Sequence, residues 1–383
     1  MQKDMIVGVI GAGTMGSGIA QIAAQAGHEV VLFDMRQQAL DASRSALKKV
    51  MERLVEKGRV KVDEAKAIQN RFTYATEINA FADCGLVIEA VIEDLAIKKQ
   101  LFEQLGSTVG PNAILATNTS SLSVTSIAAA CKLPERVIGL HFFNPAPLLP
   151  LVEVVPGLAT HEQHTKACVA LMKAWGKTPV IAKDTPGFIV NRVARPFYGE
   201  ALRIHEEGIA DMATIDHAMK TVGGFKMGPF ELMDLIGNDI NFAVTSSVFK
   251  AFFYDPRYRP SLTQQRMVEA NWLGRKTGRG YYDYSTDASL PEPKTDRDLH
   301  QMIVDRIVVM LINEAVDALQ LGIASKEDLD LAMTKGVNYP KGLLQWAQEK
   351  GYANCLSQLE ALQSEYGEDR YRPSPLLKKL ANS

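Results

Sequence analysis

One histidine and one glutamate in the middle of the chain have the residue types and spacing of a general-base pair. His141 ends an apolar run, and Glu153 lies twelve positions later within Leu151–Val155, a segment of strand-forming residues. A carboxylate buried in such a segment requires a partner, because an isolated buried charge is costly. The turn sequence Asn144-Pro-Ala-Pro147 would reverse the chain and bring the two segments side by side. A carboxylate that orients an imidazole makes it a general base, and a purely structural pair is the alternative.

A glycine-rich turn near the N-terminus has the spacing of a dinucleotide-binding loop. It follows an apolar strand expected over Met5–Ile10 and precedes a helix expected over Ser17–Gly27. In this context the three glycines permit a tight turn, close approach of the backbone to a pyrophosphate, and close helix–strand packing. The predicted pyrophosphate site is therefore the segment Gly11, Ala12, Gly13, Thr14, Met15 and Gly16.

Asp34 follows the next expected strand, Glu29–Phe33. An acid at this point accepts hydrogen bonds from the ribose hydroxyls and repels a 2′-phosphate, which favours NAD over NADP. Arg36, two residues later, is the one feature that would suit NADP instead.

Three further polar residues follow the ends of expected strands. A strand over Ala82–Val91 runs out to Glu93, and the helix after it, from about Asp94 to Leu105, carries Lys98. The next strand, Ala113–Thr117, leads into Asn118-Thr-Ser-Ser121, before a helix over Ser123–Ala130. Ligands of a doubly wound sheet bind beyond the carboxyl ends of its strands, so Glu93, Lys98 and Ser120 are predicted beside the cofactor. The alternatives are a surface ion pair for the acid and the lysine, and helix capping for the serine segment.

The overall composition indicates a soluble globular protein of two or three domains. The chain has 383 residues, is 46% hydrophobic and 22% charged, and carries a net charge of −2. No block of like charges indicates a nucleic-acid or membrane-surface partner. The four widely spaced cysteines favour neither a disulfide framework nor a zinc site, and no metal is expected. Without a signal-peptide pattern or a transmembrane-length apolar run, the expected location is cytoplasmic.

The second half of the chain contains an internal repeat at an offset of 114 residues. Glu200-Ala201 recurs as Glu314-Ala315, since 314 minus 200 is 114, and Gly208-Ile-Ala210 recurs as Gly322-Ile-Ala324. We therefore expect two copies of one helical module, the first beginning with a long helix over Phe188–Glu207. The tail beyond Tyr352 is expected to contain a docked terminal helix.

Several motifs together resemble those of the 3-hydroxyacyl-CoA dehydrogenase family, in particular its 3-hydroxybutyryl-CoA and 3-hydroxyadipyl-CoA branch. They are the glycine turn, NTSSL at 118–122, GLHFFNP at 139–145, LVEVV at 151–155 and DTPGFIVNR at 184–192. The resemblance covers residues 5–284 and implies a Rossmann-like domain, an all-helical second domain, NAD, and an acyl-CoA substrate of the fatty acid β-oxidation type.

The resemblance also implies roles for individual residues. His141 resembles the catalytic base and Glu153 its orienting acid, while Ser120 resembles the serine that contacts substrate oxygen and cofactor. Asn191 resembles the asparagine that holds the thioester end, and Asn144 resembles a cofactor contact. The remaining matches are Glu93 and Lys98, near the nicotinamide ribose, and Lys57, a coenzyme A lysine at the end of an expected helix over Gln37–Lys57. A solvated helix face is the alternative for Lys57.

The predicted fold is an α/β Rossmann-like N-terminal domain followed by an all-α domain of two tandem helical modules. The expected boundaries are 1–184 for the NAD-binding domain, 185–284 for the first module, 285–299 for a linker and 300–383 for the second module. The resemblance implies that relatives with one module dimerise through it. Our hypothesis is that residues 300–350 take the partner's place, so the chain is a homodimer or a pseudo-dimeric monomer.

The predicted reaction is NAD-dependent oxidation of a short (3S)-3-hydroxyacyl-CoA to the 3-oxoacyl-CoA, and its reverse. The alternatives are a dehydrogenase of another hydroxy acid and a non-catalytic, crystallin-like NAD-binding protein. The sequence leaves open whether a dicarboxylic acyl group is accepted. Arg195, Arg203 and Lys226 are cations that could pair with its distal carboxylate.

Overall fold

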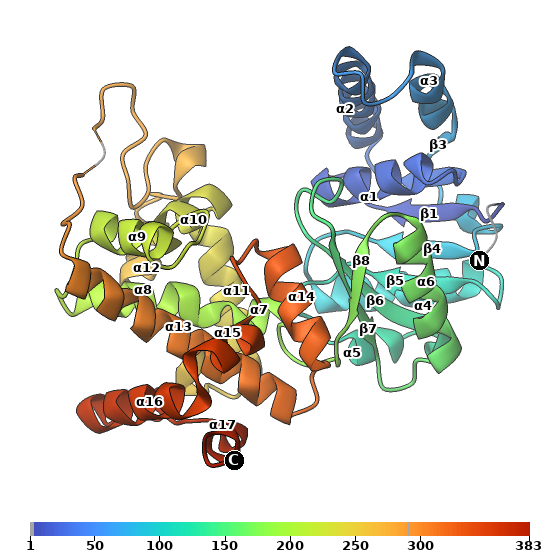
Figure 1. Ribbon diagram of the computed structural model, residues 1–383. Coiled ribbons are helices and arrows are strands. Elements are labelled where there is room, and N and C mark those ends of the chain that lie inside the picture. The colour runs from blue at the N-terminus through green and yellow to red at the C-terminus, as the bar shows by residue number, and fades with distance from the viewer. Residues whose placement is uncertain (1–3, 290) are drawn as a thin grey trace. The chain divides into compact units, whose positions relative to one another are not determined.

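The computed structural model describes residues 4–289 and 291–383, and the chain divides after Phe188 into two compact units. The N-terminal unit is built around a β-sheet with helices on both faces, and the C-terminal unit is helical (Figure 1). Both observations agree with the predicted fold class.

The described residues of the N-terminal unit form one eight-stranded sheet in the order β3-β2-β1-β4-β5-β6-β7-β8. Neighbouring strands from β3 across to β6 run parallel, β7 is antiparallel to β6, and β8 runs parallel to β7. The order reverses at β1, which is the point where doubly wound sheets bind ligands. The strands are β1 (Val7–Ile10), β2 (Val30–Phe33), β3 (Phe72–Ala75), β4 (Leu86–Glu89), β5 (Ile114–Thr117), β6 (Val137–Phe142), β7 (Leu151–Pro156) and β8 (Thr178–Ile181).

Alternate side chains of the strands pack into two hydrophobic layers, one on each face of the sheet. Val9 of β1 shares one layer with residues of α1 (Thr14–Gln25) and α6 (Glu162–Ala174). Ile10 shares the other with residues of α4 (Leu95–Thr108) and α5 (Val124–Ala128). The remaining elements of this unit are a helical hairpin and two short 3₁₀ helices. The hairpin consists of α2 (Gln37–Glu56) and α3 (Val62–Asn70), and the 3₁₀ helices are η1 (Ile78–Phe81) and η2 (Pro134–Arg136).

Two predicted boundaries in this unit were wrong. The strand expected over Ala82–Val91 is only Leu86–Glu89, because the preceding residues form η1 and a turn. The helix expected over Ser17–Gly27 begins at Thr14, directly after Gly13, and ends before Gly27, whose φ of +102° does not continue a helix.

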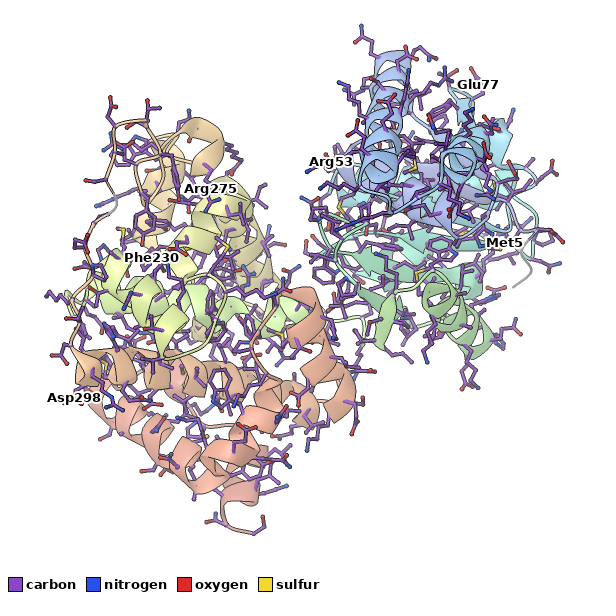
Figure 2. The ribbon with its side chains drawn as sticks, turned by 45° about the horizontal axis from the view of Figure 1, so that its top comes forward. Met5, Arg53, Glu77, Phe230, Arg275 and Asp298 are labelled. Carbon is purple, nitrogen blue, oxygen red and sulfur yellow. The ribbon has the colours of Figure 1, made fainter. Side chains whose placement is uncertain are left out.

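Helix α13 (Arg297–Gln320) is the centre of the helical unit and packs against α8, α9, α15 and α17 (Figure 1). The predicted docked terminal helix is confirmed as α17, whose Leu377 is buried. Phe230 of α10, labelled in Figure 2, is also fully buried. The other elements are α7 (Val190–Val193), α8 (Arg195–Glu206), α9 (Met212–Thr221), α10 (Pro229–Ile236), α11 (Asn238–Ala251), η3 (Pro256–Tyr258), α12 (Leu262–Glu269), η4 (Arg275–Thr277), α14 (Lys326–Gly336), α15 (Leu343–Lys350), α16 (Tyr352–Tyr366), η5 (Asp369–Tyr371) and α17 (Pro375–Ala381).

The single long helix predicted over Phe188–Glu207 was wrong, because the segment forms α7 and α8 with a break at Ala194. Pro196 explains the break, since proline lacks the N–H that would bond to the carbonyl of Arg192. Helix α13 begins at Arg297, so its first residues lie within the segment predicted as a linker.

No helix of the described ranges is long and apolar enough to cross a membrane.

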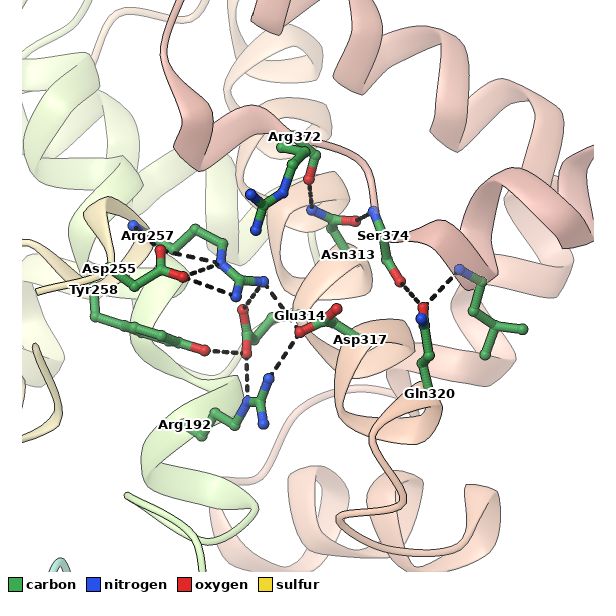
Figure 3. Close-up of polar contacts among 11 residues, drawn as sticks. Arg192, Asp255, Arg257, Tyr258, Asn313, Glu314, Asp317, Gln320, Arg372 and Ser374 are labelled. Carbon is green, nitrogen blue, oxygen red and sulfur yellow. Dashed lines mark hydrogen bonds and ion pairs between the residues drawn. The ribbon is translucent and has the colours of Figure 1, made fainter. Parts of the chain in front are cut away.

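Two buried arginine–glutamate pairs link the two halves of the helical unit. Arg192 donates from Nε to Oε1 of Glu314 at 2.6 Å, and Arg306 donates from Nε to Oε1 of Glu200 at 2.7 Å. Figure 3 shows the first pair, where Arg257 and Tyr258 also approach the Glu314 carboxylate. Adding 114 to 192 and to 200 gives 306 and 314, so each pair is the counterpart of the other in the repeat.

Candidate active site

His141 and Glu153 lie directly opposite each other on β6 and β7. Nδ1 of the histidine is 2.6 Å from Oε2 of the glutamate, and both side chains are buried. The prediction that the Asn144-Pro-Ala-Pro147 turn brings these segments together is confirmed. A carboxylate at Nδ1 fixes the tautomer in which this nitrogen donates, so Nε2 is the nitrogen that can accept a proton.

Neighbouring side chains fix the position of the histidine ring. The rings of Phe143 and Phe188 lie 4.4 Å and 5.9 Å from it, centroid to centroid. Lys177 donates from Nζ to the carbonyls of Ala146 and Leu149 at 2.6 Å and 2.9 Å, which ties down the turn after β6. A ring held in this way is pre-organised for proton transfer.

The glycine turn between β1 and α1 has the geometry that a pyrophosphate requires. Gly11 has a φ of +99°, and a Cβ on Gly16 would lie 1.8 Å from the carbonyl oxygen of Gly11. A Cβ on Gly13, in contrast, would meet no atom within 4 Å, so this residue leaves open space over the backbone. The N-terminus of α1 follows at Thr14, where its unpaired N–H groups favour an anion. These residues therefore fit a dinucleotide.

Asp34 lies at the carboxyl end of β2 and contacts the glycine turn. Its Oδ2 accepts a hydrogen bond from the backbone N–H of Ala12 at 3.0 Å, and its Oδ1 accepts one from the N–H of Arg36 at 3.0 Å. The carboxylate is thus beside the predicted pyrophosphate site, where a ribose hydroxyl of the dinucleotide would lie.

Glu93 organises the loop that carries Ser120. Its Oε1 accepts hydrogen bonds from the N–H groups of Ser120 and Ser121, at 2.8 Å and 3.1 Å, and from the hydroxyl of Thr119 at 2.6 Å. Burial raises the pKa of Glu93, but the ammonium of Lys98 and these hydrogen bonds outweigh it and hold the pKa below its usual value. Glu93, Lys98 and Ser120 are therefore brought together as predicted at the strand ends.

Sequence reasoning missed Glu89 and Thr117. Lys98 donates to Oε1 of Glu89 at 2.5 Å, and the Thr117 hydroxyl donates to Oε2 at 2.7 Å. Glu89 is fully buried and Lys98 is 1% exposed, so the alternative of a surface ion pair is wrong. The available signal was a glutamate at the end of an apolar strand, which requires a buried partner.

The remaining predicted site residues belong to three other segments of the chain. Asn144 is exposed in the turn after β6, and Lys57 is exposed at the C-terminal end of α2. Asn191 belongs to α7 of the helical unit. Among the described residues no group of three His, Cys, Asp or Glu side chains is arranged to hold a metal ion.

Family models match both units of the chain. The model described as "3-hydroxyacyl-CoA dehydrogenase, NAD binding domain" matches residues 6–185. The model described as "3-hydroxyacyl-CoA dehydrogenase, C-terminal domain" matches residues 187–284 and 302–383, which are the two copies of the helical repeat.

Curated relatives and solved structures agree with these matches. A 3-hydroxyadipyl-CoA dehydrogenase of Escherichia coli K12 is 41% identical over 98% of this chain and 97% of its own length. A probable 3-hydroxybutyryl-CoA dehydrogenase of Deinococcus radiodurans is 42% identical over 73% of this chain and 100% of its own length. The crystal structure of 3-hydroxybutyryl-CoA dehydrogenase from Escherichia coli K12 superimposes with a TM-score of 0.95 at 40% identity, covering 99% of this chain and 98% of the other.

Proposed function

The chain belongs to the 3-hydroxyacyl-CoA dehydrogenase family, and from this premise we propose that it oxidises short (3S)-3-hydroxyacyl-CoA thioesters with His141 as general base. NAD is its cofactor. The observation that carries the proposal is the 2.6 Å contact between His141 Nδ1 and Glu153 beside the carboxyl ends of the parallel strands.

The reaction requires a base for the hydroxyl proton. Bound NAD supplies the acceptor for the hydride that leaves C3. Nε2 of His141 accepts the proton from the C3 hydroxyl, and Glu153 stabilises the imidazolium that forms. In the reverse direction the imidazolium returns the proton to the oxygen of the ketone. Phe143 and Phe188 keep water away from the ring and strengthen these interactions.

Ser120 would complete the site by donating a hydrogen bond to the substrate oxygen as its charge changes. Its backbone is held by Glu93, so its hydroxyl is positioned by the ion pair that Glu93 forms with Lys98. Asn191, from the helical unit, would hold the thioester end of the substrate, and Asn144 would contact the cofactor. Lys57 remains a candidate for the coenzyme A moiety.

The acyl group is the part of the substrate that the family does not fix. Relatives named for 3-hydroxybutyryl-CoA and for 3-hydroxyadipyl-CoA both match this chain at about the same identity. We infer a short acyl chain, and a panel of thioesters from butyryl to adipyl, compared by kcat/KM, would rank the substrates.

The proposal is tested by following NADH absorbance in the presence of acetoacetyl-CoA. The wild-type enzyme should oxidise NADH, and His141→Gln should lower kcat roughly 10²- to 10⁴-fold with little change in NAD affinity. His161→Gln, on the exposed histidine before α6, is the matched control and should retain wild-type kinetics.

Two outcomes would count against this assignment. Absence of NADH oxidation by the wild-type enzyme at any pH would remove the activity and favour a non-catalytic NAD-binding protein. Equal losses of turnover and NAD affinity in His141→Gln would mean that the histidine supports the fold rather than acting as the base.

A further inference from the structure

The N-terminal end of α12, within the helical unit, borders a cavity of about 160 Å³. The cavity is larger than one water molecule requires and smaller than the sites of drug-sized ligands, which begin at roughly 300 Å³. It therefore suits a small ligand. Its lining consists of Gly199, Arg203 and Glu206 of α8 and of residues 259–263.

Arginine side chains give the lining of this cavity a net positive charge. Arg259 is exposed and has no carboxylate at ion-pair distance among the residues that the structure describes. Nη1 of Arg203 lies 3.6 Å from the carboxylate of Glu368, which is too long for a hydrogen bond. An adjoining, smaller hollow is also lined by Arg370, which is 2% exposed and whose Nε lies 3.5 Å from Glu368 without a hydrogen-bond partner. Arg203 and Arg370 thus share one carboxylate, and an added anion would be attracted to all three guanidinium groups.

The first turn of α12 adds backbone donors to the same cavity. The hydroxyl of Ser261 accepts from the N–H of Gln264 at 3.2 Å and donates to Oε1 of Glu206 at 2.5 Å. The N–H groups of Leu262 and Thr263, which precede the capped position, have no partner within the helix. Because both residues line the cavity, these N–H groups and the positive end of the helix dipole favour an anion there.

The second copy of the repeat fills the corresponding space with a side chain of its own. Gly199 corresponds to Asn313 of α13, since 313 minus 199 is 114. Nδ2 of Asn313 donates to the carbonyl of Arg372 at 3.0 Å, and its Oδ1 accepts from the N–H of Ser374 at 2.8 Å (Figure 3). An amide that both donates and accepts therefore joins α13 to the segment that precedes α17.

The first copy has no side chain for the equivalent backbone groups. The groups that Asn313 binds have counterparts in the carbonyl of Arg259 and the N–H of Ser261, since 372 minus 259 and 374 minus 261 are both 113. Gly199 cannot reach them, and a Cβ on Gly199 would meet no atom within 4 Å. A ligand in this space would have to accept from an N–H group and donate to a carbonyl, as the asparagine does in the other copy.

We propose that the cavity binds inorganic phosphate in a protonated form. Arg203, Arg259 and the N–H groups at the start of α12 would donate to its ionised oxygens. The Glu206 carboxylate and the carbonyl of Arg259 would accept from its protonated oxygen. At neutral pH inorganic phosphate keeps at least one proton and sulfate keeps none. The glutamate would therefore bond to phosphate and repel sulfate.

Bound phosphate would do for the first copy what Asn313 does for the second. It would join α8 to the start of α12 and stabilise the helical unit, because a ligand that binds only the folded state raises the free energy of unfolding. The inference concerns a site other than that of the dehydrogenase reaction, so it does not rest on the proposed function.

Isothermal titration calorimetry of the intact chain tests the site, with NAD present so that the glycine turn is occupied. The wild-type protein should bind one phosphate at millimolar concentration and sulfate roughly tenfold more weakly. Gly199→Asn, which installs the residue of the second copy, should lower phosphate affinity roughly 100-fold or more by filling the cavity. Asparagine is a better helix former than glycine and the Cβ has space, so this variant should fold.

Three further variants test the roles of the charges. Arg259→Gln should lower the affinity for both anions about tenfold, because it removes one charged donor. Glu206→Gln should narrow the difference between phosphate and sulfate, since an amide can donate to an ionised oxygen. Arg266→Gln, on an exposed arginine of α12 outside the lining, is the matched control and should bind phosphate like the wild type.

Three results would overturn the inference. Absence of binding at millimolar phosphate would remove the site. Wild-type affinity in Gly199→Asn would place any bound phosphate elsewhere, and wild-type affinity in Arg259→Gln would do the same should the first variant not fold. Equal affinities for phosphate and sulfate in the wild-type protein would contradict the role of the protonated oxygen and of Glu206.

Discussion

Glu89, the last residue of β4, connects two parts of the candidate site through one buried charge. Its Oε1 accepts from Lys98 and from the N–H of Val91, and its Oε2 accepts from Thr117. Lys98 in turn lies 3.4 Å from Glu93, which holds the loop of Ser120. The lysine is therefore shared by two carboxylates, and the position of the serine depends on a residue that does not contact it.

Replacing Glu89 by glutamine should destabilise the protein by about 3 kcal/mol, because it leaves the Lys98 ammonium buried with one weaker partner. Lys98→Met alone should also destabilise, since it leaves the Glu89 carboxylate buried. The double variant should lose less than the sum of the two, with a coupling of about 2 kcal/mol in urea unfolding. Additive losses would show that the pair is not energetically coupled.

The low pKa of Glu93 predicts a pH dependence of stability. Because the folded state lowers this pKa from 4.5, it binds the proton less tightly than the unfolded state does. The stabilisation from the carboxylate is thus present above the unfolded-state pKa and is lost as the pH falls through the folded-state value.

Glu93→Gln should therefore reduce the free energy of unfolding at pH 7, by about 1 kcal/mol after allowance for a side chain that is 35% exposed. The difference from wild type should shrink in urea titrations at a pH below 4.5. Glu103→Gln, on an exposed residue of α4, is the control. A difference that is constant with pH would mean that shape rather than charge matters at this position.

At the scale of elements, the turn between β1 and α1 contains one glycine that the fold requires and another that leaves space for the cofactor. Gly16 is required by the fold, because a Cβ there would overlap the carbonyl of Gly11. Gly13 has a φ of −72°, which any residue can adopt, and open space beyond its Cβ position. The space left by Gly13 is thus available to a ligand.

Gly16→Ala should lower the free energy of unfolding by about 3 kcal/mol or more, since the backbone must move apart. Gly13→Ala should keep the thermal midpoint of the protein without cofactor and weaken NAD binding about tenfold or more, because the methyl group occupies the pyrophosphate position. Calorimetry of both variants with and without NAD distinguishes them. Unchanged NAD affinity in Gly13→Ala would contradict the placement of the pyrophosphate.

The ends of β2 and β5 were predictable, because each strand is a short apolar run followed directly by a polar residue. The end of β4 was not, because Ala90, Val91 and Ile92 continue its apolar run beyond Glu89. The pairing of His141 with Glu153 could be inferred from a turn sequence between two such runs, and the structure places them in register. Glu89 could not be assigned a partner, because the lysine that neutralises it lies nine residues later on another element. The division of Phe188–Glu207 depended on one proline within an otherwise helical pattern.

The C-terminal tail lies within the predicted second module of 300–383, but its match to the first copy was not predicted from the sequence. Arg257-Tyr-Arg-Pro260 recurs as Arg370-Tyr-Arg-Pro373, but 370 minus 257 is 113, so a search at one fixed offset misses it. The copies are related in space as well, because the hydroxyl of Tyr258 donates to Glu314 and that of Tyr371 donates to Glu200. The tail is therefore part of the repeat.

For the whole molecule, these contacts support the hypothesis that the second module takes the place of a partner subunit. Reciprocal pairs, in which residue i contacts j and the equivalent of j contacts the equivalent of i, are typical of two-fold interfaces between subunits. Here Arg192 with Glu314 and Arg306 with Glu200 make that pattern within one chain. A face that is already covered internally cannot serve a second copy.

We therefore predict that the intact chain is a monomer in solution. Size-exclusion chromatography with light scattering should give the mass of one chain, and the thermal midpoint should not change over roughly a hundredfold range of protein concentration. Glu314→Gln should lower the midpoint, because it removes a carboxylate shared by Arg192 and Arg257, but the mass should remain that of one chain. The equivalent variant Glu200→Gln, which affects Arg306 and Tyr371, should behave in the same way. A dimer that dissociates when either glutamate is replaced would show that these faces join two chains, and the pseudo-dimer hypothesis would be wrong.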